Sequence, residues 1–183
     1  MLFIALSFLS CDKENPKLSN EDSIIEDKID SIISIMTLEE KIGQTVIYTS
    51  DSDVTGPVLD KNYQNYLRNG GIGAIFNATG AAFTRKLQKI AVEETRLGIP
   101  LIFGYDVIHG HKTIFPIPMG EASSWDLDLM QRTARISAVE ASAEGLHWTF
   151  APMVDVARDA RWGRISEGAG EDTYLCSLIS AAR

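Results

Sequence analysis

The chain has 183 residues, of which 45% are hydrophobic and 23% are charged, a composition typical of a globular enzyme domain. Its 25 acidic residues outnumber the 17 lysines and arginines and give a formal net charge of -8 at pH 7. No basic surface is therefore available to neutralise phosphates, which argues against a nucleic-acid partner. The two cysteines, Cys11 and Cys176, are too few for a disulfide-stapled fold.

The first eleven residues read as an export signal. An apolar run at residues 2–9 is followed by Ser10 and Cys11, an arrangement similar to a bacterial lipoprotein signal in which the cysteine is lipidated. The run is too short to span a bilayer, and no lysine or arginine precedes Cys11. We expect a signal at residues 1–11, a flexible tether at residues 12–20, and a lipid-anchored protein in the periplasm or outer membrane of a Gram-negative bacterium. The alternative is a frayed hydrophobic N-terminus.

Helix and strand patterns alternate along the rest of the chain. Thr37 and Glu40 have the spacing of a capping box, and Asp126 and Gly145 bracket a long helix as its N-cap and C-cap. Predicted helices cover residues 21–36, 58–68, 81–97 and 127–144, and a last helix opens after residue 171. Predicted strands cover residues 43–48, 72–77, 99–107 and 147–156, and the third is apolar enough to be buried on both faces.

This alternation predicts an α/β fold with a parallel sheet and right-handed crossovers. A doubly wound nucleotide fold needs a glycine-rich turn after the first strand, whereas residues 49–56 carry carboxylates there. A (β/α)8 TIM-like barrel gathers its polar residues at the carboxyl ends of strands, which matches Asn77, Asp106 and Asp155. Such a barrel needs roughly 250 residues, so we expect residues 21–183 to be its N-terminal half, about four βα units. The last helix has an apolar face and no stop signal, which predicts the missing C-terminal part of the same barrel as its partner.

The loop after the fourth predicted strand concentrates charges around one indole, Trp162. Carboxylates accept hydrogen bonds from sugar hydroxyls, guanidinium groups donate in a fixed fork, and an indole covers the apolar face of a pyranose. The loop therefore suits a polyol ligand; a salt-bridged loop that closes the barrel is the structural alternative. Its charged residues are Asp155, Arg158, Asp159, Arg161, Arg164, Glu167, Glu171 and Asp172.

Asp106 and two histidines end the third predicted strand. Asp106 is placed to accept hydrogen bonds from vicinal sugar hydroxyls at the barrel mouth. His109 and His111 also invite a metal-dependent hydrolase, with Asp106 and Asp155 as further ligands. The remaining histidine, His147, begins a strand and so belongs to the other end of the barrel. With so few imidazoles we predict no metal.

Several motifs follow one another along the chain. They are TLEEKIGQ at residues 37–44, GAIF at 73–76, IPLIFGYDVIHG at 99–110, FPIP at 115–118, APMVDV at 151–156, DARWGR at 159–164 and EGAGED at 167–172. In this order they resemble the N-terminal part of glycoside hydrolase family 3, of the periplasmic β-glucosidase type. The resemblance runs from about residue 21 to residue 183, and each motif alone would be weak.

This resemblance implies a retaining glycosidase that removes terminal non-reducing β-D-glucosyl residues from β-glucosides or cello-oligosaccharides, without any cofactor. It implies that Asp106 and Arg164 bind glucose hydroxyls in the -1 subsite and that Glu167 orients Arg164. Two positions depart from the family pattern: Ala160 replaces a usual proline, and Ala169 replaces a usual aromatic residue. The second departure puts the shape of the +1 subsite in doubt.

The family's catalytic pair has no counterpart in these residues. The nucleophile belongs to a Ser-Asp-Trp motif after a Lys-His pair, and the acid/base comes from a following domain; the chain contains neither motif. Asp126 follows Trp125 and therefore has the wrong order. We expect the chain by itself to be inactive. A β-xylosidase or N-acetylhexosaminidase on the same scaffold, and a non-catalytic glycan-binding surface lipoprotein, remain as alternatives.

Overall fold

A computed structural model describes residues 19–50 and 62–183 and divides the chain into two compact units, Met1–Met36 and Thr37–Arg183. The predicted signal with Cys11, and most of the predicted tether, lie outside the described residues. In the first unit, helix α1 (Asn20–Ile35) confirms the helix expected at residues 21–36. It begins with a capping box in which the Ser19 hydroxyl accepts from the backbone N–H of Asp22 and the Asp22 carboxylate accepts from that of Ser19.

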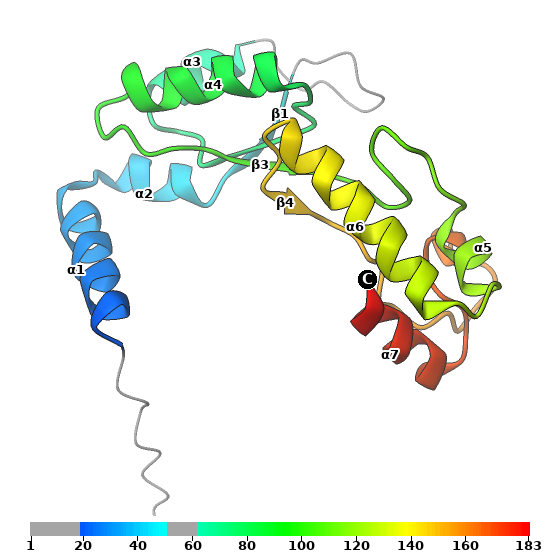
Figure 1. The fold of residues 1–183 in the computed structure, drawn as a ribbon. Helices are drawn as coiled ribbons and strands as arrows, with labels where there is room; N and C mark the ends of the chain where they lie inside the picture. The colour runs from blue at the N-terminus through cyan, green and yellow to red at the C-terminus, as the bar shows by residue number, and fades with distance from the viewer. Residues whose placement is uncertain (1–18, 51–61) are drawn as a thin grey trace, which may run out of the picture. The chain divides into compact units, whose positions relative to one another are not determined.

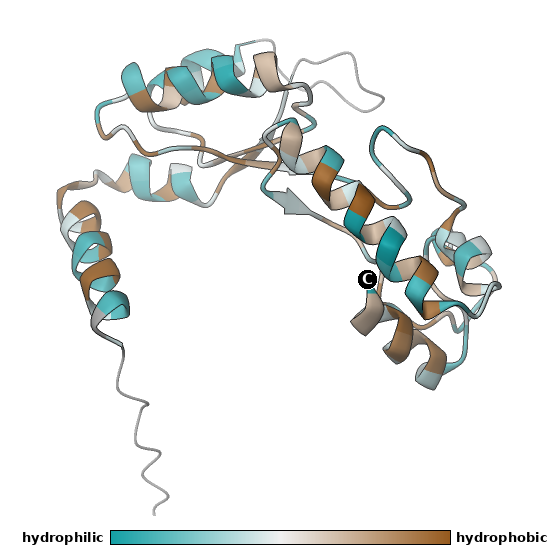
Figure 2. Ribbon diagram, viewed as in Figure 1, coloured by the Kyte–Doolittle hydropathy of each residue, from teal (hydrophilic) through white to brown (hydrophobic). Residues whose placement is uncertain are grey.

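Helix α1 is amphipathic, and brown and teal residues alternate along it in Figure 2. Its isoleucines are between 40% and 58% exposed, so the expected apolar stripe is present and is accessible to solvent. Across the described ranges, none of the helices has the length and apolarity needed to cross a membrane.

The second unit is built on a parallel sheet. Its strands are β1 (Ile47–Thr49), β2 (Ala74–Phe76), β3 (Ile102–Tyr105) and β4 (Trp148–Thr149), and neighbours in the sheet are also neighbours in the chain (Figure 1). The four parallel strands in sequential order, with helices between them, confirm the predicted α/β half-barrel. Each strand is shorter than predicted, most of all β4, which takes up only two of the ten residues 147–156.

The helices of this unit follow the predicted order. The capping box of Thr37 and Glu40 is confirmed and opens a helix that runs to Gln44, so residues 43 and 44 are helical instead of extended as predicted. The side chain of Asp126 caps the long helix, as predicted, by accepting from the backbone N–H of Leu129 at 2.8 Å. The helices are α2 (Leu38–Gln44), α3 (Tyr63–Arg68), α4 (Ala81–Glu93), α5 (Pro118–Ala122), α6 (Leu127–Ala143), α7 (Thr173–Ala182) and the 3-10 turn η1 (Ile165–Glu167).

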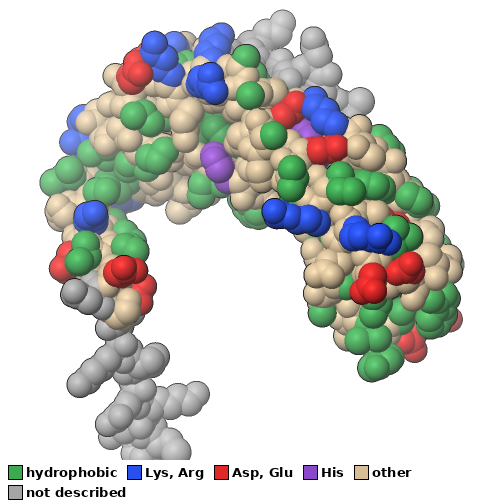
Figure 3. All heavy atoms as spheres, in the orientation of Figure 1, with side chains coloured by type: hydrophobic (Ala, Val, Ile, Leu, Met, Phe, Trp, Pro, Cys, Tyr) green, Lys and Arg blue, Asp and Glu red, His purple; other side chains and the backbone are tan. Residues whose placement is uncertain are grey.

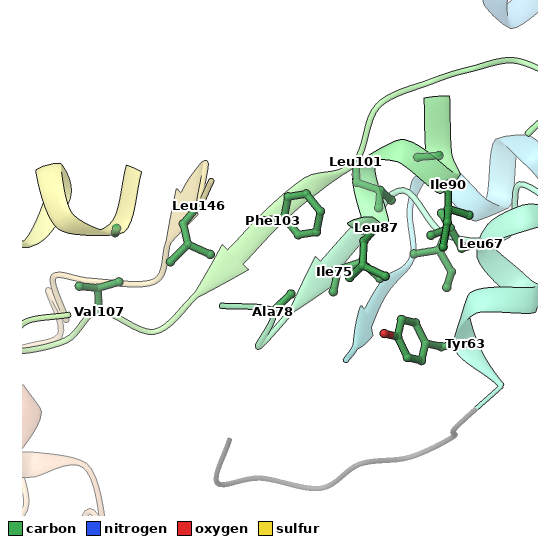
Figure 4. Packing of buried hydrophobic residues seen from close by; sticks show 13 residues of the cluster. Tyr63, Leu67, Ile75, Ala78, Leu87, Ile90, Leu101, Phe103, Val107 and Leu146 are labelled. Atoms are coloured by element: carbon green, nitrogen blue, oxygen red, sulfur yellow. The ribbon is translucent and has the colours of Figure 1, made fainter. Parts of the chain in front are cut away.

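One face of the sheet packs against α3 and α4 and forms the main core. The register places Tyr48, Ile75 and Phe103 side by side on this face. Figure 4 shows Leu87 and Ile90 of α4 directed toward them, and Ile75 and Leu87 are fully buried. The alternation of side chains along a strand therefore assigns the opposite face to Thr49, Phe76 and Gly104 and to their neighbours.

The exposure of that opposite face contradicts the prediction that the third strand is buried on both faces. Ile102 is 50% exposed, so the third strand is buried on one side and not on both; in β4, Trp148 is 47% exposed and Thr149 is exposed as well. The inner face of a barrel is covered by side chains of strands across the barrel, and the four strands of this sheet lie side by side in one row. The apolar residues of the inner face are therefore open to solvent in this chain.

A second, smaller cluster joins α5, α6 and α7. It contains Ala122, Met130 and Ile179, and Ala169 packs against it. Ala169 therefore contributes to helix packing. Cys176 of α7 is 4% exposed, and burial raises the pKa of its thiol.

Candidate functional site

The carboxyl ends of the first three strands lie at one edge of the sheet. Beyond β2, the backbone N–H of Asn77 donates to the carbonyl of Gly104 at 3.2 Å, and the Ser50 hydroxyl donates to the carbonyl of Asn77 at 2.6 Å. Asn77 has a φ of 61°, the left-handed region that only a few residue types adopt readily. The segments that leave the strands are thus held in defined places beside the residue that follows β3.

That residue is Asp106. Tyr105 contacts the core on the helix side, so the strand alternation turns Asp106 toward the inner face, which it shares with Gly104. Asp106 is exposed, and no hydrogen bond or ion pair to its carboxylate occurs within residues 19–50 and 62–183. Its oxygens are therefore available to an external donor.

Arg164 and Glu167 form an ion pair in the long loop after β4. The turn η1 starts directly after Arg164 and brings Glu167 back against it, so that the guanidinium Nε and Nη2 donate to Glu167 Oε2 at 2.8 and 2.6 Å. These hydrogen bonds raise the pKa of Arg164, and the negative charges of Asp106 and Asp155 raise it further. Since those charges act on the guanidinium, the long loop and the end of β3 lie within electrostatic reach of each other.

The other ion pair of the loop is local. Arg161 donates to Asp159 through Nε and Nη2, with the shortest contact at 2.5 Å, and the Arg161 side chain is 90% exposed. The charges of the loop thus fall into two separate ion pairs. The negative charge of Asp106 acts on the guanidinium of Arg164, whereas Asp159 and Arg161 pair within the turn that contains them.

Aromatic rings line the inner face next to Asp106. No role was predicted for them from the sequence. Phe150 meets Phe76 edge-on at 5.4 Å and lies 4.7 Å from Trp148, measured between ring centroids. A Cβ at Gly104 would lie 3.3 Å from the Phe150 ring, so glycine leaves the space that the ring needs. The sequence signal that could have identified these rings is an alternation: the apolar residues Trp148 and Phe150 stand on either side of the polar Thr149.

Each histidine has a partner within the protein. His109 Nδ1 lies 3.0 Å from the carbonyl of Phe115, His111 Nε2 lies 2.8 Å from Glu144 Oε2, and His147 Nδ1 accepts from the backbone N–H of Phe103 at 3.2 Å. Among the residues that the structure describes, no group of three or more His, Cys, Asp or Glu side chains is placed to hold a metal ion.

Comparison with known proteins places the whole second unit in one family. The family model described as "Glycosyl hydrolase family 3 N terminal domain" matches residues 37–182. The chain is 44% identical over 151 residues to the periplasmic beta-glucosidase of Salmonella typhimurium, covering 82% of this chain and 19% of that protein. It is 31% identical over 192 residues to a putative beta-xylosidase of Formosa agariphila, covering 94% of this chain and 25% of that protein.

Solved structures agree with the sequence comparison. The beta-glucosidase from Listeria innocua in complex with glucose matches with a TM-score of 0.74 and 36% identity, over 86% of this chain and 23% of that one. The same enzyme in complex with isofagomine matches with a TM-score of 0.74 and 38% identity. The chain thus spans about a fifth to a quarter of the length of the relatives that it matches.

Proposed function

The chain belongs to glycoside hydrolase family 3, and we propose that it is the first half of the barrel of a β-glucosidase that removes terminal non-reducing β-D-glucosyl residues. One observation carries the proposal. The exposed Asp106 carboxylate, without a partner among the described residues, stands within electrostatic reach of an Arg164 guanidinium that Glu167 holds. A pyranose presents vicinal hydroxyls, which can donate to such a carboxylate and accept from such a guanidinium at the same time.

The roles of the three residues follow from their surroundings. Asp106 accepts from sugar hydroxyls. Arg164 donates from Nη1, which the contact with Glu167 leaves available. Glu167 orients the guanidinium and contributes no contact to the sugar. Because these interactions recognise the glycone and not the bond that is cleaved, they serve binding in the -1 subsite rather than proton transfer.

The cleavage itself requires two further carboxyl groups. A retaining glycosidase places a nucleophile and an acid/base about 5–5.5 Å apart across the scissile bond. We propose that both come from outside these 183 residues, so that the chain by itself binds weakly and does not hydrolyse. A displacement of this kind moves protons and a glycosyl group between carboxyl groups and water, so we expect it to proceed without metal or organic cofactor.

We also propose that the protein is exported and anchored through a lipid on Cys11. The relatives from Salmonella typhimurium and Dickeya chrysanthemi are described as periplasmic, which supports the periplasmic part. Replacement of Cys11 by serine should move the protein from the membrane fraction to the soluble periplasmic fraction. An unchanged distribution on immunoblots of fractionated cells would argue against the anchor.

Hydrolysis of 4-nitrophenyl β-D-glucoside tests the main proposal. The longer protein that contains this chain should release 4-nitrophenol, the purified 183-residue chain should not, and Asp106→Asn in the longer protein should lower kcat/KM by at least about a hundred-fold. Asp159→Asn, which removes a carboxylate of the local pair in the same loop, is the matched control and should stay within about two-fold. Equal activity of the Asp106 variant and the control would refute the assignment.

A β-xylosidase is the second candidate, because relatives from Formosa agariphila carry that description and the one from Dickeya chrysanthemi is described as beta-glucosidase/beta-xylosidase. The ratio of kcat/KM for the 4-nitrophenyl glucoside and xyloside decides between the two. A ratio above one favours the β-glucosidase. Glucose binding without hydrolysis of either substrate would instead indicate a glycan-binding protein.

A further inference from the structure

A partly buried carboxylate at the end of α6 accepts hydrogen bonds from other segments. Glu144, the C-cap of this helix, accepts from Lys112 Nζ at 2.6 Å and from the backbone N–H of Gly80 at 3.1 Å, and it lies 2.8 Å from His111 Nε2. The Glu144 side chain is 15% exposed and that of His111 is 5% exposed. Figure 3 shows acidic, basic and histidine side chains side by side over this end of α6.

The partners of Glu144 come from two different connections of the sheet. Gly80 ends the segment between β2 and α4, and His111 and Lys112 belong to the loop that begins with Asp106 after β3. The Thr84 hydroxyl reinforces the first link by donating to the backbone carbonyl of Glu144 at 2.8 Å. One side chain therefore contacts both connections.

The link continues to Asp106. The ring of His111 meets Tyr105 edge-on at 5.6 Å between centroids, and Tyr105 directly precedes Asp106. One helical turn before Glu144, Glu140 accepts from the backbone N–H groups of Lys112 and Thr113, both at 2.8 Å. Glu144 thus holds the loop through the side chains of His111 and Lys112, and Glu140 holds it through backbone N–H groups.

The position of Glu140 and Glu144 in the helix does not stabilise their negative charges. Glu140 and Glu144 are four residues apart, where like charges repel, and they lie at the C-terminal end of α6, where the helix dipole disfavours anions. Burial alone would raise the pKa of Glu144, but the hydrogen bonds of Lys112 and His111 outweigh it and lower the pKa. The loop after β3 therefore supplies what stabilises the charge on Glu144.

We propose that Glu144 is a positioning residue of the sugar site: it ties the loop that starts at Asp106 to the connection between β2 and α4 and so holds Asp106 in place. The sugar-binding role of Asp106 rests on the proposed function, whereas the tie between the two connections does not. Glu144 itself does not contact the sugar.

Kinetics of Glu144→Gln in the longer protein test the effect on the site. Glutamine keeps the shape but replaces an acceptor with a donor that faces other donors, so KM for 4-nitrophenyl β-D-glucoside should rise about ten-fold while kcat changes less than about two-fold. A merely structural role would lower the fraction of active molecules, and therefore kcat, with KM unchanged; that result overturns the proposal. Glu93→Gln, which removes an exposed carboxylate of α4, is the matched control and should change neither constant.

Lys112→Met provides a second variant should Glu144→Gln fail to fold. It removes one partner of Glu144 from a side chain that is 65% exposed and leaves no buried donor unpaired. KM should rise in the same direction and by less, and an unchanged KM would count against the proposal.

Hydrogen–deuterium exchange of the purified chain tests the tie without any activity. Glu144→Gln should speed exchange in residues 78–84 and 107–115 and leave α3 and α7 at the wild-type rate. Unchanged exchange in both connections would overturn the proposal even if the longer protein hydrolyses the glucoside. If the longer wild-type protein does not hydrolyse the glucoside while the variant still exchanges faster in both connections, the proposed function is refuted. The link that Glu144 makes between the two connections would then still stand.

Discussion

Replacement of Leu87 by alanine should destabilise the second unit strongly. Leu87 is fully buried in the main core, where Figure 4 shows it between α4 and the strands β2 and β3. The change removes three carbon atoms, worth about 2.4 kcal/mol at about 0.8 kcal/mol each, before any cost of the cavity is added. With that cost, we expect a loss of about 2–5 kcal/mol in the free energy of unfolding.

Val92→Ala on the same helix is the matched control, because Val92 is 47% exposed and alanine is the better helix former. Its effect should stay within about 0.5 kcal/mol. Urea denaturation of both variants, followed by circular dichroism at 222 nm, gives the comparison. Equal losses in the two variants would refute the assignment of Leu87 to the core and, with it, the packing of α4 on the sheet that carries Asp106.

Three other outcomes are expected. Hydrogen bonds from Arg96 and from the helix start lower the pKa of Glu40 from 4.5 to about 2, so its stabilising effect is complete above pH 4.5 and is lost as the pH falls toward 2. The Tm of Glu40→Gln should therefore lie below the wild-type value at pH 7 and approach it over that range; a constant gap would contradict the pairing. Gly43→Ala places a Cβ 2.1 Å from a backbone carbonyl and should lower Tm by several degrees in differential scanning calorimetry, unlike an alanine at an exposed helix position. Glu167→Gln should lower kcat/KM of the longer protein about ten-fold by loosening Arg164, and a change below two-fold would exclude the orienting role.

Most of the architecture could be predicted because local signals and the fold agree. The capping box at Thr37 and the N-cap at Asp126 set helix starts that the structure confirms, since those hydrogen bonds form within one turn of the helix. The strands were predicted less well. Residues 147–156 have the composition of a strand, but only Trp148 and Thr149 pair, because pairing depends on a neighbouring strand and not on the residues themselves.

The candidate site, too, could be predicted from the sequence only in part. Asp106, Arg164 and Glu167 could be selected from motifs, and the contact between Arg164 and Glu167 follows from their separation by three residues around one turn. The separation of the pair Asp159 and Arg161 from that site could not be predicted, since a crowded loop can pair its charges in several ways. Glu144 was missed because its partners lie 33 and 64 residues away in the sequence.

The sequence by itself determined the family and the alternation of helices and strands, and it supplied the candidates for sugar binding, because motifs, periodicity and caps are set by neighbouring residues. Only the tertiary structure decided which face of the sheet is buried, which charges of the long loop pair with each other, and that Glu144 contacts two connections of the sheet. Those features depend on residues brought together over long separations, where the geometry of packing selects one arrangement among many that the same residue types would allow.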